Sequence, residues 1–163
     1  MSTALPPEFD AFWRTAHEVA PSLSPQRFYE AFAFGDSAAL ADDLADLVLR
    51  GDKRATASLL WTFEAEGRSP PRPGDLSIVT RWDRTAVCII ETTAVDVVAF
   101  DQVSEAFAQA EGEDDRTLQS WRRNHAAFFA RECARIGRTP RPDMPVLCER
   151  FRVVYRPDCT APA

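Results

Sequence analysis

The chain has 163 residues, a length that suits one globular domain with a single core. Hydrophobic residues make up 45% and charged residues 27%, which is ordinary for a globular protein, and no apolar run approaches the ~20 residues that a membrane helix needs. The net charge of −6 excludes a protein that coats nucleic acid through bulk positive charge, but it permits a local basic cleft.

The termini and cysteines indicate an intracellular protein without a metal centre. Residues 1–7 lack the basic start and apolar core of a secretory signal, so we expect a cytoplasmic location. Cys88, Cys133, Cys148 and Cys159 form no Cys-x-x-Cys pair, and the two histidines add no zinc-like spacing. We therefore expect reduced cysteines, with Cys88 and Cys148 in the core, and neither a metal nor a cofactor.

The first third of the chain predicts a helix, a strand and a second helix. Apolar residues recur at three- and four-residue steps over 7–20, whereas large and small side chains alternate over 28–34. Asp36 or Ser37 is expected to cap the second helix, and Gly51 to end it.

The remainder predicts a hairpin, two more helices and a final strand. The segments are strands over 76–82 and 86–100, a helix capped by Asp101, a long helix over 117–136 and a strand over 146–155. The stretch 58–66 fits either a short helix or an extended segment. This order favours an α+β fold in which helices surround a mixed or antiparallel sheet.

Lys53 is an exception in the composition. The chain contains 18 arginines and this single lysine, which lies in the segment Gly51-Asp52-Lys53-Arg54-Ala55-Thr56. Arginine stays charged, whereas a buried or crowded lysine can lose its proton and act as a nucleophile or base. If the backbone turns here, the Lys53 amine and the Thr56 hydroxyl face one side. The alternative is a solvated lysine in a loop that follows a helix.

A series of short motifs resembles the ASCH family, in its long bacterial type, whose fold is a small β-barrel related to the PUA domains of RNA-modifying proteins. The motifs are Phe34-Gly35-Asp36, Gly51-x-Lys53-x-x-Thr56, Pro73-Gly74-Asp75, Cys88-Ile89-Ile90-Glu91-Thr92-Thr93, Phe107-Ala108-x-x-Glu111-Gly112, Trp121-x-x-x-His125-x-x-x-Phe129 and Cys148-Glu149-x-Phe151. The resemblance runs from Phe34 to about Tyr155. We expect a single domain over 1–163, with 1–26 as an N-terminal helical extension and 157–163 as a loose tail.

The resemblance implies that RNA or a nucleotide-like ligand binds in a cleft between the barrel and the helices. Characterised relatives are ribonucleases or amidohydrolases of acylated cytidine nucleosides. The lysine, threonine and glutamate of the amidohydrolases correspond to Lys53, Thr56 and Glu111. Those enzymes are shorter and lack the N-terminal helix and the helix that carries Trp121 and His125, so the substrate of this chain stays open.

Two kinds of function fit these residues. In a metal-independent hydrolase, a neutral Lys53 takes the proton of Thr56, whose hydroxyl attacks an amide carbonyl, or Lys53 stabilises the oxyanion. Because Glu111 lies next to the acidic residues 113–115, crowding would raise the pKa of a carboxyl group there to a value useful for acid–base catalysis. The alternative is a ribonuclease, or a non-catalytic RNA-binding regulatory module, that uses the same cleft.

Five further residues are predicted to contact the ligand. Arg54 and Arg122 are candidates for a phosphate, Trp82 for stacking on a base, Ser58 for a polar contact and His125 for a proton shuttle. His125 also has a purely structural interpretation, which is packing against the helix turn that precedes it.

Overall fold

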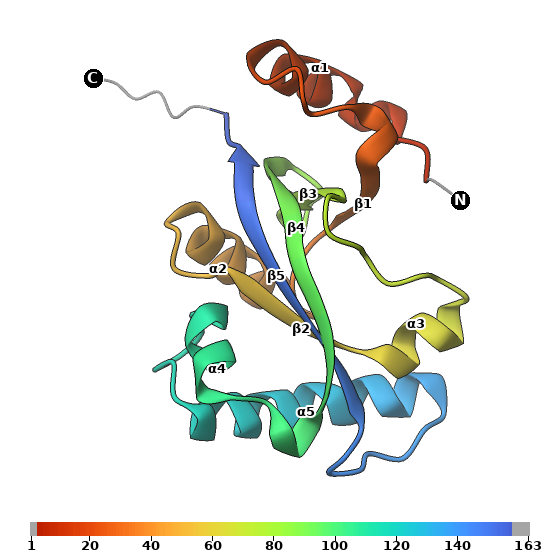
Figure 1. Cartoon of the computed structure of the whole chain (residues 1–163), viewed down its shortest axis with the longest axis vertical. Coiled ribbons are helices and arrows are strands. Elements are labelled where there is room, and N and C mark those ends of the chain that lie inside the picture. Colours follow the sequence, from red (N-terminus) through yellow and green to blue (C-terminus); the bar gives the residue numbers. More distant parts are fainter. Residues whose placement is uncertain (1–2, 158–163) are drawn as a thin grey trace. The chain divides into compact units, whose positions relative to one another are not determined.

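The structure is a computed structural model that describes residues 3–157, and it confirms the predicted α+β fold (Figure 1). The strands are β1 (Phe28–Phe32), β2 (Ala55–Leu59), β3 (Leu76–Thr80), β4 (Ala86–Ala99) and β5 (Pro145–Tyr155). The α-helices are α1 (Asp10–Val19), α2 (Ala38–Leu49), α3 (Leu60–Glu66), α4 (Glu105–Glu111) and α5 (Leu118–Ile136). Short 3-10 helices occur at Pro7–Phe9, Pro25–Arg27 and Phe100–Gln102.

The strands form a mixed sheet in the order β1-β3-β4-β5-β2. β1 pairs with β3 in parallel, whereas β3 pairs with β4, and β2 with β5, in antiparallel fashion. Because β1 and β2 stand at the two ends of this order, the sheet is open over the residues that the structure describes. The expected barrel is therefore not closed.

The chain forms two compact units, and neither is a continuous stretch of sequence. Unit 1 comprises the described residues up to Gly51, Arg72–Thr93 and those from Phe151 onward. Unit 2 comprises Asp52–Pro71 and Ala94–Arg150.

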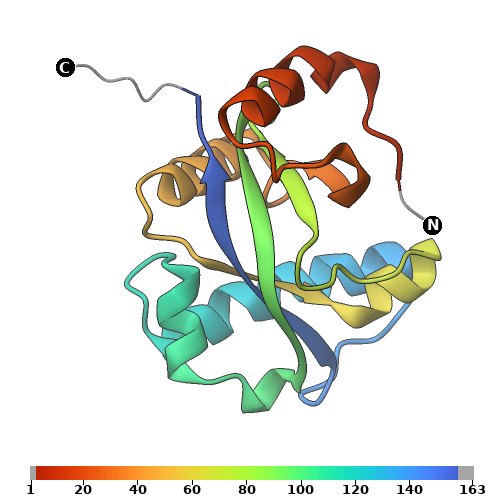
Figure 2. The same cartoon turned by 45° about the horizontal axis from the view of Figure 1, so that its top comes forward.

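In unit 1, the β3–β4 hairpin buries a different set of side chains on each face. Ile78 lies opposite Ile89, and both belong to the hydrophobic cluster that α1 joins (Figure 2). Val79 lies opposite Cys88, and both belong to the cluster that contains Val48 of α2. Because successive side chains of a strand point to opposite faces, this register requires a helix on each side of the hairpin.

In unit 2, β2 and β5 present small and medium side chains to a core built on α5. Ala57 pairs with Cys148 and Leu59 with Val146, and this face packs with Trp121 of α5 in one hydrophobic cluster. Both α3 and α4 contact α5, near opposite ends of that helix (Figure 1). This core positions the candidate site.

Helix starts were predicted well where a side chain caps the backbone. The Ser37 hydroxyl accepts a hydrogen bond from the N–H of Leu40, and the Thr117 hydroxyl from that of Ser120. The prediction that Asp101 caps a helix is wrong: this residue lies in a 3-10 turn, and the cap of α4 is Ser104.

The predicted state of the cysteines is confirmed where the structure describes them. Cys88, Cys133 and Cys148 are buried free thiols, whereas Cys159 lies outside the described residues. Apart from Pro157, the tail predicted over 157–163 also lies outside them. Within 3–157, every helix is too short or too polar to span a bilayer.

Candidate functional site

Lys53 is the centre of a buried cluster of charged side chains in unit 2. Only 1% of the side chain is exposed, and Nζ donates to the carbonyl oxygen of Ala55 at 2.8 Å. The same ammonium donates to Glu111 Oε2 at 2.7 Å and to Glu113 Oε2 at 2.5 Å. Its three N–H groups therefore each have an acceptor, two of which carry negative charge.

The backbone around Gly112 brings both carboxylates to Lys53. Gly112 ends α4 with φ +69°, and a Cβ at this position would lie 2.0 Å from the carbonyl oxygen of Asp52. The N–H of Arg54 donates to the carbonyl oxygen of Ala110 at 2.8 Å. The segment that carries Lys53 therefore lies directly on the end of α4, an approach that only glycine permits.

The second oxygen of Glu111 is held by α5. Trp121 Nε1 donates to Glu111 Oε1 at 2.9 Å, and His125 Nε2 lies 3.2 Å from the same atom. The other ring nitrogen of His125, Nδ1, lies 2.9 Å from the carbonyl oxygen of Trp121. Because both ring nitrogens face acceptors, the doubly protonated imidazolium satisfies this geometry best. The rings of Trp121 and His125 stack at 4.2 Å.

The four ionisable groups balance one another. With His125 protonated, two positive charges face the negative charges of Glu111 and Glu113. Burial by itself would lower the pKa values of Lys53 and His125, but the neighbouring carboxylates outweigh it and raise both. Burial would raise the pKa of Glu111, yet the Lys53 ammonium and the hydrogen bond from His125 lower it.

Glu113 differs from Glu111 in both exposure and ionisation. Its side chain is 23% exposed, against 1% for Glu111, so it forms the solvent-facing side of the cluster. Burial raises the pKa of Glu113; Lys53 opposes this rise, and the charge of Glu111 adds to it. Of the two carboxyl groups in this cluster, Glu113 is therefore the one better suited to take up a proton.

These directions bear on two points about ionisation that the sequence leaves open. Lys53 is a charged ammonium ion rather than a neutral base, because two carboxylates lie within hydrogen-bonding distance. The carboxyl group with a raised pKa is that of Glu113, not that of Glu111. Sequence reasoning noted the acidic run after Glu111 but did not identify Glu113 as a partner of Lys53.

The backbone does not form the turn that was the condition for placing Thr56 beside the amine. Thr56 lies in β2 opposite Glu149 of β5, and its side chain is half-buried. Since Ala55, Ala57 and Leu59 are the buried residues of this strand, Thr56 and Ser58 point to the other face. Lys53 and Glu111 are thus paired directly, whereas Thr56 is held in the sheet opposite Glu149.

Glu111, Glu113 and His125 also have the residue types of a metal site, with ligand atoms within 4.8 Å of one another. However, Lys53 Nζ already lies 2.7 Å from one of these carboxylates and 2.5 Å from the other. The ammonium occupies the position that a divalent cation would take, so this donor set does not fit a metal while Lys53 is present.

The remaining predicted contacts are dispersed. His125 is buried in the cluster, and Arg54 and Arg122 are exposed in unit 2. Trp82, predicted to stack on a base, belongs to unit 1 and is 50% exposed.

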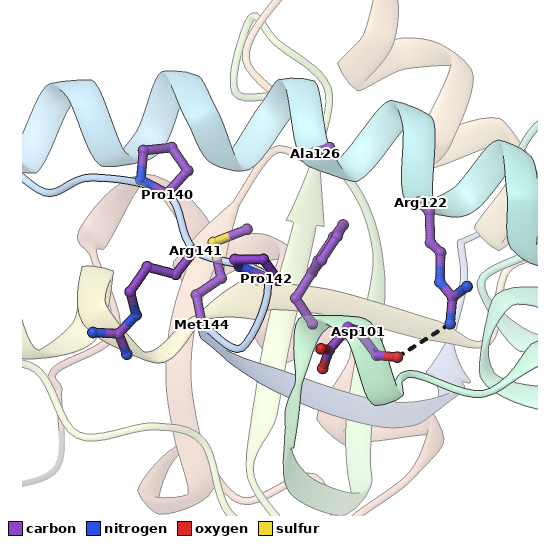
Figure 3. A pocket seen from close by; sticks show the side chains of 8 residues that line it. Asp101, Arg122, Ala126, Pro140, Arg141, Pro142 and Met144 are labelled. Carbon is purple, nitrogen blue, oxygen red and sulfur yellow. Dashed lines mark hydrogen bonds between the residues drawn. The ribbon is translucent and has the colours of Figure 1, made fainter.

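A pocket of about 390 Å³ lies beside α5 in unit 2 (Figure 3). Its apolar lining consists of Phe100, Ala126, Pro140, Pro142 and Met144. Sequence reasoning did not predict it, because these residues come from α5 and from two segments about 40 residues apart in sequence.

The pocket has three charged residues in addition to its apolar lining. Asp101, Arg122 and Arg141 complete the lining, and Arg122 Nη2 donates to the carbonyl oxygen of Asp101 at 3.2 Å (Figure 3). Arg122, predicted as a phosphate contact, therefore lies at this pocket.

Comparison with known proteins relates the chain to one family. A family model described as an ASCH domain matches residues 30–155. The crystal structure of an ASCH domain from Lactobacillus crispatus is 37% identical in sequence, with a TM-score of 0.85 over 96% of this chain and 100% of that one. A protein of known structure from Enterococcus faecalis is 33% identical, with a TM-score of 0.80 over 88% of this chain and 86% of that one. None of the curated proteins matches.

Proposed function

Because this chain belongs to the ASCH-domain family, whose members are generally PUA-like RNA-binding domains, we propose that it binds RNA or a modified nucleoside derived from RNA. We further propose that it is a metal-independent hydrolase of RNA or of acylated cytidine, acting through Lys53, Thr56 and Glu111. The observation that carries this proposal is the buried ammonium of Lys53, held between two carboxylates. Such an arrangement keeps a positive charge in a fixed place with little water around it.

The charge states define what each group can contribute to amide hydrolysis. Lys53, as a cation, stabilises the oxyanion that forms when the hydroxyl of Thr56, or a water molecule, attacks the carbonyl carbon. Glu113 has the raised pKa of a general base and accepts the proton of the nucleophile. The carbon–nitrogen bond then breaks, and that proton passes to the leaving amine. Where Thr56 is the nucleophile, a water molecule then hydrolyses the acyl ester formed on its hydroxyl, which releases the acid and restores Thr56. Glu111 stays ionised and holds Lys53 in position.

This chemistry requires the substrate to take the place of one partner of Lys53. Glu113 is the partially exposed one, and it follows the last residue of α4 by only two positions, in the loop before α5. Movement of its carboxylate away from Nζ would expose one N–H of Lys53 to a carbonyl or phosphate oxygen. Glu111 is anchored by Trp121 and cannot move without losing that hydrogen bond.

A second candidate function is RNA binding without catalysis. It is favoured by the closure of the cluster, in which Lys53 and Glu111 are each only 1% exposed. In this case the buried ions serve to hold α4, α5 and the segment before β2 together, and RNA is bound by other surfaces of the fold.

One set of assays separates these functions. N4-acetylcytidine and an end-labelled single-stranded RNA are incubated with the parent protein and with the Glu111→Gln, Glu113→Gln and Thr56→Val variants. Glu105→Gln, on the exposed part of α4, is the matched control. A hydrolase releases acetate or cleaves the RNA, and the Glu111, Glu113 and Thr56 variants lose at least about tenfold in rate, as removal of a general base or an oxyanion-stabilising group typically does.

RNA binding is measured in parallel at 50 and 200 mM salt. Binding that weakens as salt rises, without turnover of either substrate, supports the non-catalytic function. Turnover that the Glu111 and Thr56 variants retain in full excludes the proposed catalytic residues. Binding that does not weaken with salt excludes RNA contacts through phosphates.

A further inference from the structure

We propose that the pocket beside α5 is a subsite for one unstacked nucleobase of single-stranded RNA, with a preference for bases that carry an exocyclic amino group. This inference rests on the proposed RNA binding and identifies where one nucleotide is held. A volume of about 390 Å³ lies within the range of small-molecule sites, and the lining is mostly apolar.

The walls of the pocket suit the flat faces of a base. Phe100, Pro142, Met144 and Ala126 of α5 contribute apolar atoms to the lining, and backbone hydrogen bonds fix the segment at Phe100 against the one at Met144. The N–H of Phe100 donates to the carbonyl oxygen of Met144 at 2.9 Å, and that of Asp101 to Pro142 at 2.9 Å. Protein surfaces that bind single-stranded RNA commonly hold splayed bases against aromatic and apolar side chains in this way.

Positive charge on two sides of the pocket suits the phosphates that flank a nucleotide in a strand. Figure 3 shows Arg122 and Arg141 on opposite sides of the lining, with Pro142 and Met144 between them. Arg122 is exposed and oriented by its hydrogen bond to the carbonyl oxygen of Asp101, and Arg141 Nε donates to Asp143 Oδ1 at 3.0 Å. A guanidinium has five N–H donors, so each arginine retains donors for a phosphate oxygen.

Asp101 supplies the preference among bases. Its side chain is the one acidic group among the residues that line the pocket. A carboxylate accepts hydrogen bonds from the amino groups of cytosine, adenine or guanine, and it finds no such donor in the exocyclic groups of uracil. It also repels a phosphate, so the base rather than the backbone is expected to lie near it.

The pocket is connected to the buried charge cluster through two aromatic rings. Phe100 lies 5.6 Å from Trp121, centroid to centroid, with an interplanar angle of 30°. Trp121 in turn donates its indole N–H to Glu111. A base that contacts Phe100 is therefore separated from Trp121 only by the Phe100 side chain, and Trp121 orients Glu111, which pairs with Lys53.

The test measures the affinity of the full chain for eight-nucleotide oligocytidylate, oligouridylate and an abasic ribose-phosphate chain of equal length. The Ala126→Phe variant fills the pocket, and Ala127→Phe, its exposed neighbour on α5, is the matched control. Arg122→Gln, compared with Arg131→Gln on the same helix, provides a second variant that leaves the packing unchanged. Melting temperatures establish that each variant folds.

We expect the parent to bind oligocytidylate more tightly than the other two chains. Ala126→Phe should weaken this binding at least about fivefold, as loss of one stacked base does, and should leave binding of the abasic chain unchanged. Equal affinity for all three chains, or equal effects of Ala126→Phe and Ala127→Phe, would overturn the base subsite while leaving RNA binding intact. A parent that binds none of the three chains at 50 mM salt would instead overturn the proposed RNA binding, and the subsite with it.

Discussion

At the scale of single residues, the cluster around Lys53 is a closed arrangement of two cations and two anions. Glu111 uses both carboxylate oxygens, one for Lys53 and the other for Trp121 and His125. Removing one member of such a buried set leaves its partner as a buried charge with no opposite charge beside it. The resulting loss of folding free energy is larger than the net stabilisation that the ion pair provides. The stability of unit 2 should therefore depend strongly on Lys53.

The Lys53→Met variant tests this dependence. We expect its free energy of unfolding to fall by about 3–5 kcal/mol at pH 8, because the buried carboxylates lose their cation. In the parent, the raised pKa of Lys53 contributes stability below about pH 10, and the lowered pKa of Glu111 contributes it above about pH 4.3. Both contributions are thus complete at pH 8.

The deficit of the variant should shrink towards pH 5, where the uncompensated carboxylates take up protons. Without the Lys53 cation, the pKa values of these carboxyl groups are raised in the folded variant. Protonation as the pH falls therefore removes their buried charge and recovers part of the lost stability. Urea titrations of parent and variant at pH 5, 6.5 and 8 measure this. The Lys53→Met/Glu113→Gln double variant is the control and should recover part of the loss. A deficit of equal size at all three pH values would show that lost packing, not charge, is its cause.

The pairing of Lys53 with Glu111 shows which contacts of the site could be predicted from the sequence. Nothing in the spacing of two residues 58 positions apart predicts their contact, and only the resemblance to the ASCH family indicated it. The charge state of Lys53 was left open between a neutral base and a cation, because it depends on Glu111 and also on Glu113. That residue was visible only as part of an acidic run, and a run of acids in sequence is usually a solvated loop.

At the scale of elements, the predictions were good where a local side-chain signal exists. Ser37 and Thr117 cap their helices as capping chemistry requires. β2 was missed because Ala-Thr-Ala-Ser-Leu has no large side chains to reveal its alternation, and its pairing with β5 is a long-range contact. Since Thr56 lies in this strand, the missed element also explains why its backbone is extended and not in a turn.

The link between α4 and the segment before β2 gives a second prediction. Gly112→Ala should lower the free energy of unfolding by more than about 3 kcal/mol, because the new methyl group would meet the carbonyl oxygen of Asp52 and φ is positive. Gly137→Ala is the matched control: it ends α5 with a similar φ of +75° but has no atom within 4 Å of the new Cβ. It should cost about 1 kcal/mol.

Urea denaturation of the two variants provides the comparison. If Gly112→Ala proves no more destabilising than Gly137→Ala, the close approach of Asp52 to the end of α4 is not rigid, and the positions of Glu111 and Glu113 relative to Lys53 are not fixed by it.

At the scale of the whole molecule, the sequence predicted the class of fold but not the closure of its sheet. Hydrophobic periodicity identifies elements, whereas the order of strands depends on contacts between distant segments. The net charge of −6 argues against bulk attraction to nucleic acid, so we expect any RNA contact to come from local groups such as Arg122 and Arg141.

Because the single lysine of the chain is buried, its chemical modification measures how often the structure around it opens. Acylating reagents need an exposed, unprotonated amine, and Lys53 is neither in the folded state. With N-hydroxysuccinimidyl acetate, peptide mass mapping should find Lys53 unmodified in the native protein and acetylated in urea, whereas the Arg131→Lys variant gains a site that reacts at once. Modification of Lys53 at the rate of that surface site would mean that the cluster opens freely. If modification is slow, its rate instead measures how often local opening exposes the Lys53 amine to solvent.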